Sequence, residues 1–338
     1  MITSTRRSSG SAPAIVSLIA TILFLAAAGW LFLNRQYVLD QIVVWQYSPT
    51  KSIEQLVTES GMGEKGRFYF YASRPVLSDA SSFNQECKRQ EESSAILGCY
   101  SGRKIFIYDI ADERLAGIKE VTAAHEMLHA AYERMPEEEK SRVNSLLDVE
   151  YQKVLAQSDD DALKERMAYY ARTEPGEHNN ELHSIIATEV KTVSSGLEEH
   201  YDTYFDDRQK VVALHGSYNS KFEELRQSSE QLKTELETLS DDINISSDQY
   251  NADISSLNAD IEQFNAQADT GTYATETEFQ AARAALLSRV DELKQRREVI
   301  DVKIANYEAK RLSYNKTVDE SNSLTRSLDS SLAPAPSI

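Results

Sequence analysis

The sequence predicts an α+β protein that is mainly α-helical, with an N-terminal transmembrane helix, a small mixed domain and a long antiparallel coiled-coil hairpin. Three observations support this: an uncharged apolar run near the N-terminus, a middle region with both strand-like and helical periodicity, and a heptad pattern after it. The predicted organisation is a cytoplasmic N-terminus (1–13), a transmembrane helix (14–33), a linker (34–51), the mixed domain (52–205), the hairpin (206–330) and a disordered tail (331–338).

The apolar run near the N-terminus is long enough to cross a bilayer. No charged residue interrupts Ala14–Leu33, and about 20 apolar residues in a helix span the hydrocarbon core. Arg6 and Arg7 precede the run and only Arg35 follows closely, so a single-pass plasma-membrane protein with a cytoplasmic N-terminus is expected. The alternative is a signal peptide cleaved within Ala26–Gly29. In either case the bulk of the chain is extracytoplasmic.

The charge balance excludes one class of partner. The chain has 54 acidic and 36 basic residues and a formal net charge of -18, which repels the phosphate backbone of nucleic acids. No nucleic acid is therefore expected as a partner. A charge of this size is typical of a solvated exterior, and no substrate preference follows from it.

The cysteines agree with export. Cys87 and Cys99 are the only two in the chain, and in an oxidising compartment they are expected to form a disulfide that closes a short loop between two strands. The alternative is a pair of free thiols. No CxxC spacing is present, so a zinc site built on cysteines is not supported.

The mixed domain contains segments of both periodicities. Arg67–Ala72 alternates aromatic residues and Lys104–Ile110 is rich in β-branched and aromatic residues, so both are predicted to be strands. Helical spacing predicts helices over Ser52–Glu59, Val121–Arg134, Pro136–Ala156 and Asp161–Ala171, and a much longer helix that begins near Asn180 after a turn at Glu174–Gly176.

The predicted helix Val121–Arg134 carries the motif HExxH. His125 and His129 are four residues apart, so both imidazoles project from one helix face, as two zinc ligands must. Glu126 is offset by one residue, which places its carboxylate beside a metal-bound water and suits a general base. Small alanines flank the histidines and allow another element to pack closely. The alternative is a helix with two ordinary half-buried histidines.

A strand, an HExxH helix and a distant acid occur in this order in zincin metallopeptidases, which the stretch from about Arg67 to Thr192 resembles. In gluzincins, including thermolysin-like enzymes, the third zinc ligand is a glutamate on a later helix, followed three residues on by a small residue. Asn180–Ser184 matches this arrangement, with Glu181 as the ligand and Ser184 as the small residue. Thermolysin-like enzymes have an aspartate next, which orients the first histidine, whereas this chain has Ile185.

Two residues compete with Glu181 for the metal. Glu189 falls on an apolar helix face, and a buried carboxylate needs a partner, so it could bind zinc itself or orient a zinc-bound imidazole. The resemblance favours Glu181 for zinc and Glu189 for support, with His183 as a further candidate ligand. The resemblance also implies a second donor to the oxyanion, for which the candidates are His183, His200, Tyr201 and Tyr204.

The C-terminal part is predicted to be two helices that fold back on one another. Apolar residues step by three and four along residues 201–264, with a slip near Ser247 that is typical of a stutter. Residues 267–277 break the pattern, which resumes over 286–328. The polar residues of the seam are expected to set the register or to be tolerated, and its histidine is expected to pack: Arg208, Ser229, Arg297 and His215.

Together these features predict a membrane-anchored, extracytoplasmic zinc metallopeptidase that hydrolyses peptide bonds in a protein or peptide substrate. Two imidazoles and one carboxylate leave a fourth position on Zn²⁺ for water, and Glu126 would accept its proton. The hairpin would position the enzyme, receive substrate or bind a cell-envelope partner. The alternatives are a non-enzymatic membrane-tethered scaffold with an inactive zincin-like domain, and the same chemistry directed at cell-wall peptide cross-links.

Overall fold

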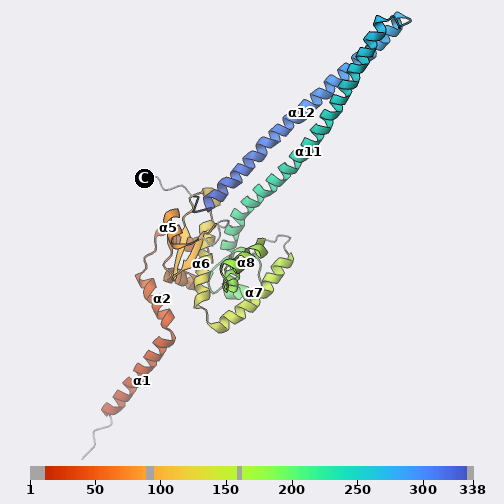
Figure 1. Ribbon diagram of the computed structural model, residues 1–338. Helices are drawn as coiled ribbons and strands as arrows, with labels where there is room; N and C mark the ends of the chain where they lie inside the picture. Colours follow the sequence, from red (N-terminus) through yellow and green to blue (C-terminus); the bar gives the residue numbers. More distant parts are fainter. Residues whose placement is uncertain (1–11, 89–94, 158–161, 333–338) are drawn as a thin grey trace, which may run out of the picture. The chain divides into compact units, whose positions relative to one another are not determined.

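The computed structural model describes residues 12–88, 95–157 and 162–332 (Figure 1). Within them helices dominate and three short strands form one sheet, so the predicted fold class is confirmed. The chain divides into two compact units. The first, called the head, comprises Met1–Asn219 and Arg326–Ile338, and the second, called the hairpin, is Ser220–Thr325.

The N-terminal helix has the character predicted for a membrane span. Helix α1 (Ala12–Leu33) contains Ala14–Leu33, which by length and composition could cross a membrane and, lying near the N-terminus, could equally be a signal sequence. None of that segment is buried against the rest of the protein. Most of the predicted cytoplasmic segment, residues 1–11, lies outside the described residues.

The segment predicted to be a linker, residues 34–51, is largely helical. After a break at Asn34, helix α2 (Arg35–Gln46) forms, and helix α3 (Lys51–Glu59) follows with Thr50 as its N-cap. The helix α2 is fastened to the head because Asp40, which is buried, pairs with Arg134. A local pattern cannot show this partner, which lies 94 residues further along the chain.

The prediction of a strand over Arg67–Ala72 is wrong, because these residues belong to helix α4 (Glu64–Ala72). Alternating aromatic residues suggested one buried face and one solvated face. Instead, the aromatic rings of α4 contact different neighbours around the helix: Phe68 lies beside Tyr37, Tyr71 beside Tyr47 and Tyr69 beside Tyr204.

The sheet has the strand order β1-β3-β2. Strand β1 (Val76–Ser78) runs parallel to β3 (Lys104–Tyr108), and β2 (Gly98–Ser101) runs antiparallel to β3, so the strand predicted over Lys104–Ile110 is present. Gly102 and Arg103 both have positive φ, as a two-residue hairpin turn of type I′ requires. The disulfide Cys87–Cys99 is formed, but it joins β2 to the end of helix α5 (Ala80–Glu86) and not to a second strand.

The centre of the head is helix α6 (Ile118–Arg134), which follows the short 3-10 helix η1 (Glu113–Leu115). Most of α6 is buried, including four alanines that offer little bulk to neighbouring elements: Ala123, Ala124, Ala130 and Ala131. Helix α6 packs against the sheet and against α3, α4 and α9. Helix α6 is therefore enclosed on almost all sides, and each buried polar side chain on it needs a specific partner.

The predicted long helix from Asn180 is wrong, because the chain forms three separate helices there. After α7 (Glu137–Gln157) and α8 (Ala162–Thr173) come α9 (His178–Glu189), α10 (Ser195–Tyr201) and α11 (Arg208–Asp269). The backbone is extended at Val190 and at Ser194. The apolar pattern ran across these breaks because all three helices bury residues in the same core.

The hairpin consists of the greater part of α11 packed antiparallel on α12 (Glu276–Leu328). Ion pairs between the two helices define the register: Asp260–Arg289, Asp253–Arg296, Asp242–Lys303 and Glu235–Lys310. Between the second and third pairs, α11 advances by eleven residues and α12 by seven. The four extra residues in α11 are a stutter around the predicted Ser247.

One seam prediction fails within the hairpin, and the tail is only partly described. Arg297 does not lie in the seam, because its side chain is 70 % exposed and pairs with Asp301 on the same helix. Of the predicted disordered tail, residues 333–338 lie outside the described residues.

Candidate metal centre

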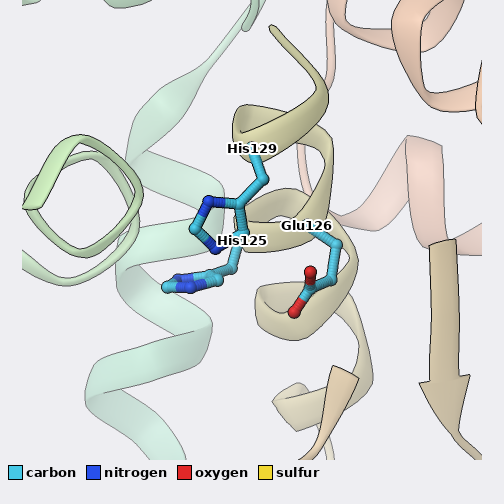
Figure 2. A group of neighbouring side chains, drawn as sticks. All are labelled: His125, Glu126 and His129. Atoms are coloured by element: carbon cyan, nitrogen blue, oxygen red, sulfur yellow. The ribbon is translucent and has the colours of Figure 1, made fainter. Parts of the chain in front are cut away.

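Helix α6 brings three potential metal-binding side chains together. Figure 2 shows His125 and His129 on one side of the helix, with Glu126 on the adjoining surface. Their ligand atoms all lie within 4.8 Å of one another, and the two imidazole rings meet edge to face with centroids 4.7 Å apart. The helix holds this geometry because four residues make little more than one turn.

Helix α9 places Glu181 opposite both imidazoles. Its carboxylate oxygens lie 3.6 Å from Nε2 of His125 and 3.4 Å from Nε2 of His129. Ligand atoms at bonds of about 2.0–2.2 Å to a tetrahedral ion are themselves about 3.3–3.6 Å apart. Glu181 is 4 % exposed, and its buried Oε2 has no hydrogen-bond partner. The spacing and the unsatisfied oxygen both fit a metal ion held between the three side chains.

The neighbours of His129 orient its ring for such a role. Its Nδ1 lies 3.0 Å from Oδ1 of Asn180 and 3.3 Å from Oγ of Ser184. The amide nitrogen of Asn180 donates to Glu177, so the amide oxygen faces the imidazole and accepts from Nδ1–H. The Nε2 lone pair then faces the carboxylate of Glu181. Two acceptors in this arrangement need a cation between them, either a proton or a metal ion.

The structure does not bring Glu189 to the imidazoles, in contrast to its predicted role as alternative ligand or support. Arg166 on α8 donates to both oxygens of Glu189, at 2.9 and 2.6 Å. His215 Nε2 lies 3.4 Å from the same carboxylate. The sequence correctly indicated that this carboxylate on an apolar face needs a partner, but the partner is a guanidinium.

The four predicted oxyanion donors lie in the core of the head. Nε2 of His183 is 3.0 Å from Nε2 of His200, and the hydroxyl of Tyr201 donates to the carbonyl of His183. None of these three residues, nor Tyr204, is more than 2 % exposed, and none lines the cavity at the HExxH motif. His183 is therefore neither a ligand nor an oxyanion donor in this arrangement.

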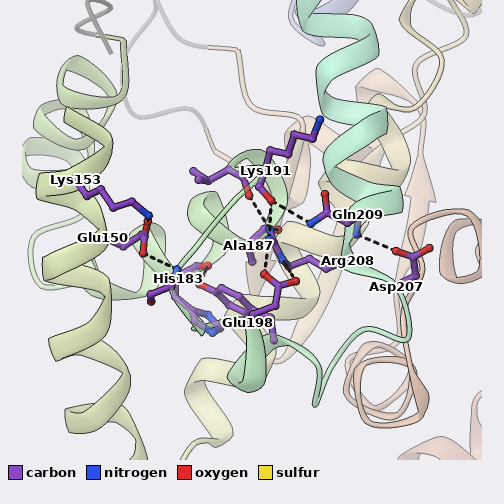
Figure 3. A network of polar contacts seen from close by, with 12 residues as sticks. Glu150, Lys153, His183, Ala187, Lys191, Glu198, Asp207, Arg208 and Gln209 are labelled. Atoms are coloured by element: carbon purple, nitrogen blue, oxygen red, sulfur yellow. Dashed lines mark hydrogen bonds and ion pairs between the residues drawn. The ribbon is translucent and has the colours of Figure 1, made fainter. Parts of the chain in front are cut away.

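Helix α9 is held in place by Arg208, which the sequence suggested as a seam residue of the coiled coil. Arg208 is 2 % exposed and belongs to the head. As Figure 3 shows, it donates to the carbonyls of Ala187 and Lys191 and to the carboxylate of Glu198. It also donates to the carbonyl of Val190. These bonds satisfy the carbonyl groups exposed where α9 ends, and so Arg208 fixes the helix that carries Glu181.

A cavity of about 540 Å³ opens beside the three ligand candidates, lined by residues of β2, α6, α7, α8 and α9. Three tyrosines line it: Tyr100, Tyr132 and Tyr170. The hydroxyl of Tyr100 donates to Glu133 and that of Tyr132 to Asn144, whereas Tyr170 lies in the cavity wall together with Glu181. No sequence pattern indicated a role for Tyr170, because its helix shows no motif and its neighbours at the cavity come from other segments.

Strand β2 approaches Glu126 closely through Gly98. A Cβ atom at this position would lie 2.7 Å from Oε1 of Glu126 and 2.6 Å from Cγ2 of Thr122. Only glycine therefore leaves room for the Glu126 carboxylate in its observed place.

Burial and neighbouring charge shift the pKa values at this site. Burial raises the pKa of Glu126, and the charges of His129 and His125 reduce that effect. Burial alone would raise the pKa of Glu181 as well, but the charges of His129 and His125 outweigh it, so its pKa is lowered. Glu181 is thus kept ionised, the state that a metal ligand needs, while Glu126 takes up a proton more readily than an ordinary glutamate.

Exchange of the two competing carboxylates for amides is expected to separate their roles. Glu181→Gln should abolish stoichiometric metal binding by the purified chain, because an amide neither supplies charge nor replaces the carboxylate between the imidazoles. Glu189→Gln should keep the metal, since its partner is Arg166. Metal content measured by elemental analysis checks both. If the Glu181→Gln variant kept its full metal content, Glu181 would not be a ligand.

The ring orientation of His129 gives a second expectation. Asn180→Ala removes the acceptor at Nδ1 and should weaken metal affinity by about 10–100-fold, the usual effect of losing such a partner. The adjacent Asn179→Ala is the matched control and should leave affinity unchanged. Competition with a chelator measures both. Equal affinities in the two variants would contradict the proposed orientation.

Known proteins give no further guide to this site. The chain matches no protein-family model, no curated protein and no solved structure. The chemistry of the site is therefore inferred from the site itself.

Proposed function

We propose that this protein is a zinc metallopeptidase that α1 attaches to the membrane and that hydrolyses peptide bonds outside the cytoplasm. The observation that carries the proposal is the carboxylate of Glu181 facing both imidazoles of the HExxH motif, at 3.4 and 3.6 Å. Two histidines and one glutamate are the donor set of catalytic zinc, which keeps a fourth position open, whereas structural sites are closed by four protein ligands.

The residues would divide the chemistry between them. Zinc, when bound, supplies Lewis acidity that polarises a carbonyl group and makes water more acidic. Glu126 takes a proton from the attacking water and passes it to the leaving amine. Its raised pKa favours that exchange, because burial makes the protonated carboxyl less costly to form. Gly98 keeps the space that the carboxylate needs.

Tyr170 is the donor we assign to the developing oxyanion. It lines the cavity with Glu181 and both histidines, whereas the hydroxyls of the other two cavity tyrosines, Tyr100 and Tyr132, already donate to Glu133 and Asn144. Burial, with the charge of Glu181, raises its pKa far above the ordinary value, so the phenol stays protonated and can donate. Donors placed in advance where charge develops account for a large part of enzymatic rate enhancement.

The walls of the cavity suit an extended peptide with basic side chains. Strand β2 lines the cavity and pairs only with β3 among the described strands, so its other edge is open to a peptide that adds as a strand. Carboxylates line the cavity away from the motif at Glu133, Glu174 and Glu177, against one cation, Lys140. This balance favours cationic peptides over acidic ones.

The general base distinguishes an enzyme from a scaffold. Glu126→Gln should keep the metal but lose peptidase activity by about 10²–10⁴-fold, the usual contribution of general acid–base catalysis. Glu120→Gln is the matched control, since Glu120 is a buried glutamate on the same helix that does not line the cavity, and it should keep full activity. Cleavage of a quenched-fluorescent peptide library measures both. If the native chain, loaded with metal, cleaved no peptide of the library, whatever the charge of the peptide, the non-enzymatic scaffold would be favoured.

The tyrosine pair on α8 offers a similarly matched test. Tyr170→Phe should lower kcat by about 10²–10³-fold, as loss of one oxyanion donor does, and should leave KM and metal content nearly unchanged. Tyr169→Phe alters the adjacent ring, which does not line the cavity, and should behave as the native chain. Steady-state kinetics on the best library peptide separates the two. A change in KM alone for Tyr170→Phe would assign that residue to substrate binding.

A further inference from the structure

Helix α2 has an inner face that is fastened to the head by a buried ion pair. Both oxygens of Asp40 accept from Arg134, at 2.9 Å from Nε and 3.0 Å from Nη2, and both side chains are nearly inaccessible. Arg134 is the last residue of α6, and its Nη1 donates to the hydroxyl of Tyr100 in the cavity wall. The helix that follows α1 is therefore part of the head and not a flexible tether.

The opposite face of α2 carries exposed apolar side chains, with the exposed Arg35 on the same face at the start of the helix. Leu39, Ile42 and Trp45 follow one another at intervals of three residues, which places them along one side of the helix. They are 53 %, 40 % and 78 % exposed. The acid of this helix, Asp40, points to the inner side. In a chain with a net charge of -18, an exposed apolar face without a carboxylate marks a contact surface.

We propose that this outer face, Leu39, Ile42 and Trp45, lies in the interfacial layer of the membrane that α1 enters, so that the head is held against the lipid surface. The inference rests on the proposed anchoring by α1. The partner that it names is the lipid bilayer, and it adds that α2 lies along the membrane surface.

Continuity with α1 favours lipid over a protein partner. Only Asn34 separates the end of α1 from the start of α2, and its backbone is not helical, so the chain can change direction there. If α2 continued along the axis of α1, Trp45 would stand about 15 Å beyond the start of α2. The interfacial layer on one side of a bilayer is only about 5–8 Å thick. All three side chains reach it together only if α2 lies along the surface.

The residue types match that position. Tryptophan is enriched at the membrane–water interface because its ring is apolar and its N–H can still bond to water or headgroups. Interfacial helices bury such a face at the boundary between headgroups and acyl chains. Because Arg134 links the inner face to α6 and to Tyr100, the cavity would be held close to the membrane. Polypeptides that lie near the membrane surface are then the substrates within reach.

The two tryptophans of the chain, Trp30 in α1 and Trp45 in α2, allow a direct test. The full chain with Trp30→Phe, reconstituted into phosphatidylcholine vesicles, reports on Trp45 alone. We expect a blue-shifted emission that lipids brominated near the headgroup quench more strongly than lipids brominated near the chain end. The reciprocal variant Trp45→Phe reports on Trp30, which lies about 5 Å inside the end of the span Ala14–Leu33 and should be quenched at a greater depth than Trp45.

The outcomes distinguish this inference from the anchoring on which it rests. Quenching of Trp30 with water-like, unquenched emission from Trp45 would overturn the inference and leave the anchor intact. Blue-shifted emission from Trp45 that brominated lipids do not quench would mean that protein covers the face, either a second copy or another partner, and would also overturn it. No quenching of Trp30 would remove the anchor and the inference with it. As a second variant, Leu39→Ser with Ile42→Ser in the Trp30→Phe chain should reduce the quenching of Trp45.

Discussion

The packing of α9 on α6 is the contact on which the candidate site depends. The small alanines of α6 are buried and let α9 come close enough for the short side chain of Glu181 to reach both imidazoles. The position of α9 along α6 is then fixed at two points, by Asn180 against His129 and by Arg208 where α9 ends. In enzymes, displacing a catalytic group by about 1 Å can lower the rate about 10²-fold. These two contacts, which set the position of α9, are therefore as important to the candidate site as the candidate ligands.

Buried charge in the head supports the same interpretation. Asp40, which is buried, pairs with Arg134, as buried carboxylates generally require, and the less buried Glu189 and Glu198 pair with Arg166 and Arg208. Among the buried side-chain atoms of the described residues, Oε2 of Glu181 is the one carboxylate oxygen without a hydrogen bond. Its neighbours are the nitrogens of two imidazoles. A fold that pairs these three carboxylates with arginines and leaves Glu181 facing two imidazole nitrogens has the electrostatics of a cation site.

The sequence could predict what local periodicity determines, and no more. The spacing of His125 and His129 fixes their common face in any helix, and the short pattern around Glu181 located the facing carboxylate. The errors share one cause, since each misread residue has a partner distant in the chain. The helix α2 depends on Arg134, α4 is surrounded by rings from three segments, and Glu189 is explained by Arg166 and His215. Tyr170 was missed for the same reason, because only the tertiary fold brings it to Glu181.

The two segments that the sequence assigned to accessory roles are structural parts of the site. The predicted linker supplies Asp40, which holds the last residue of the HExxH helix, and the predicted coiled coil supplies Arg208, which holds the end of α9. A domain boundary at residue 206 would separate Arg208 from three backbone carbonyls and from Glu198. Arg208 is 2 % exposed, and each buried carbonyl that lost its hydrogen bond would cost about 1–3 kcal/mol, a large part of the stability of a small domain. The unit that carries the candidate metal centre therefore extends from α2 to the first turns of α11.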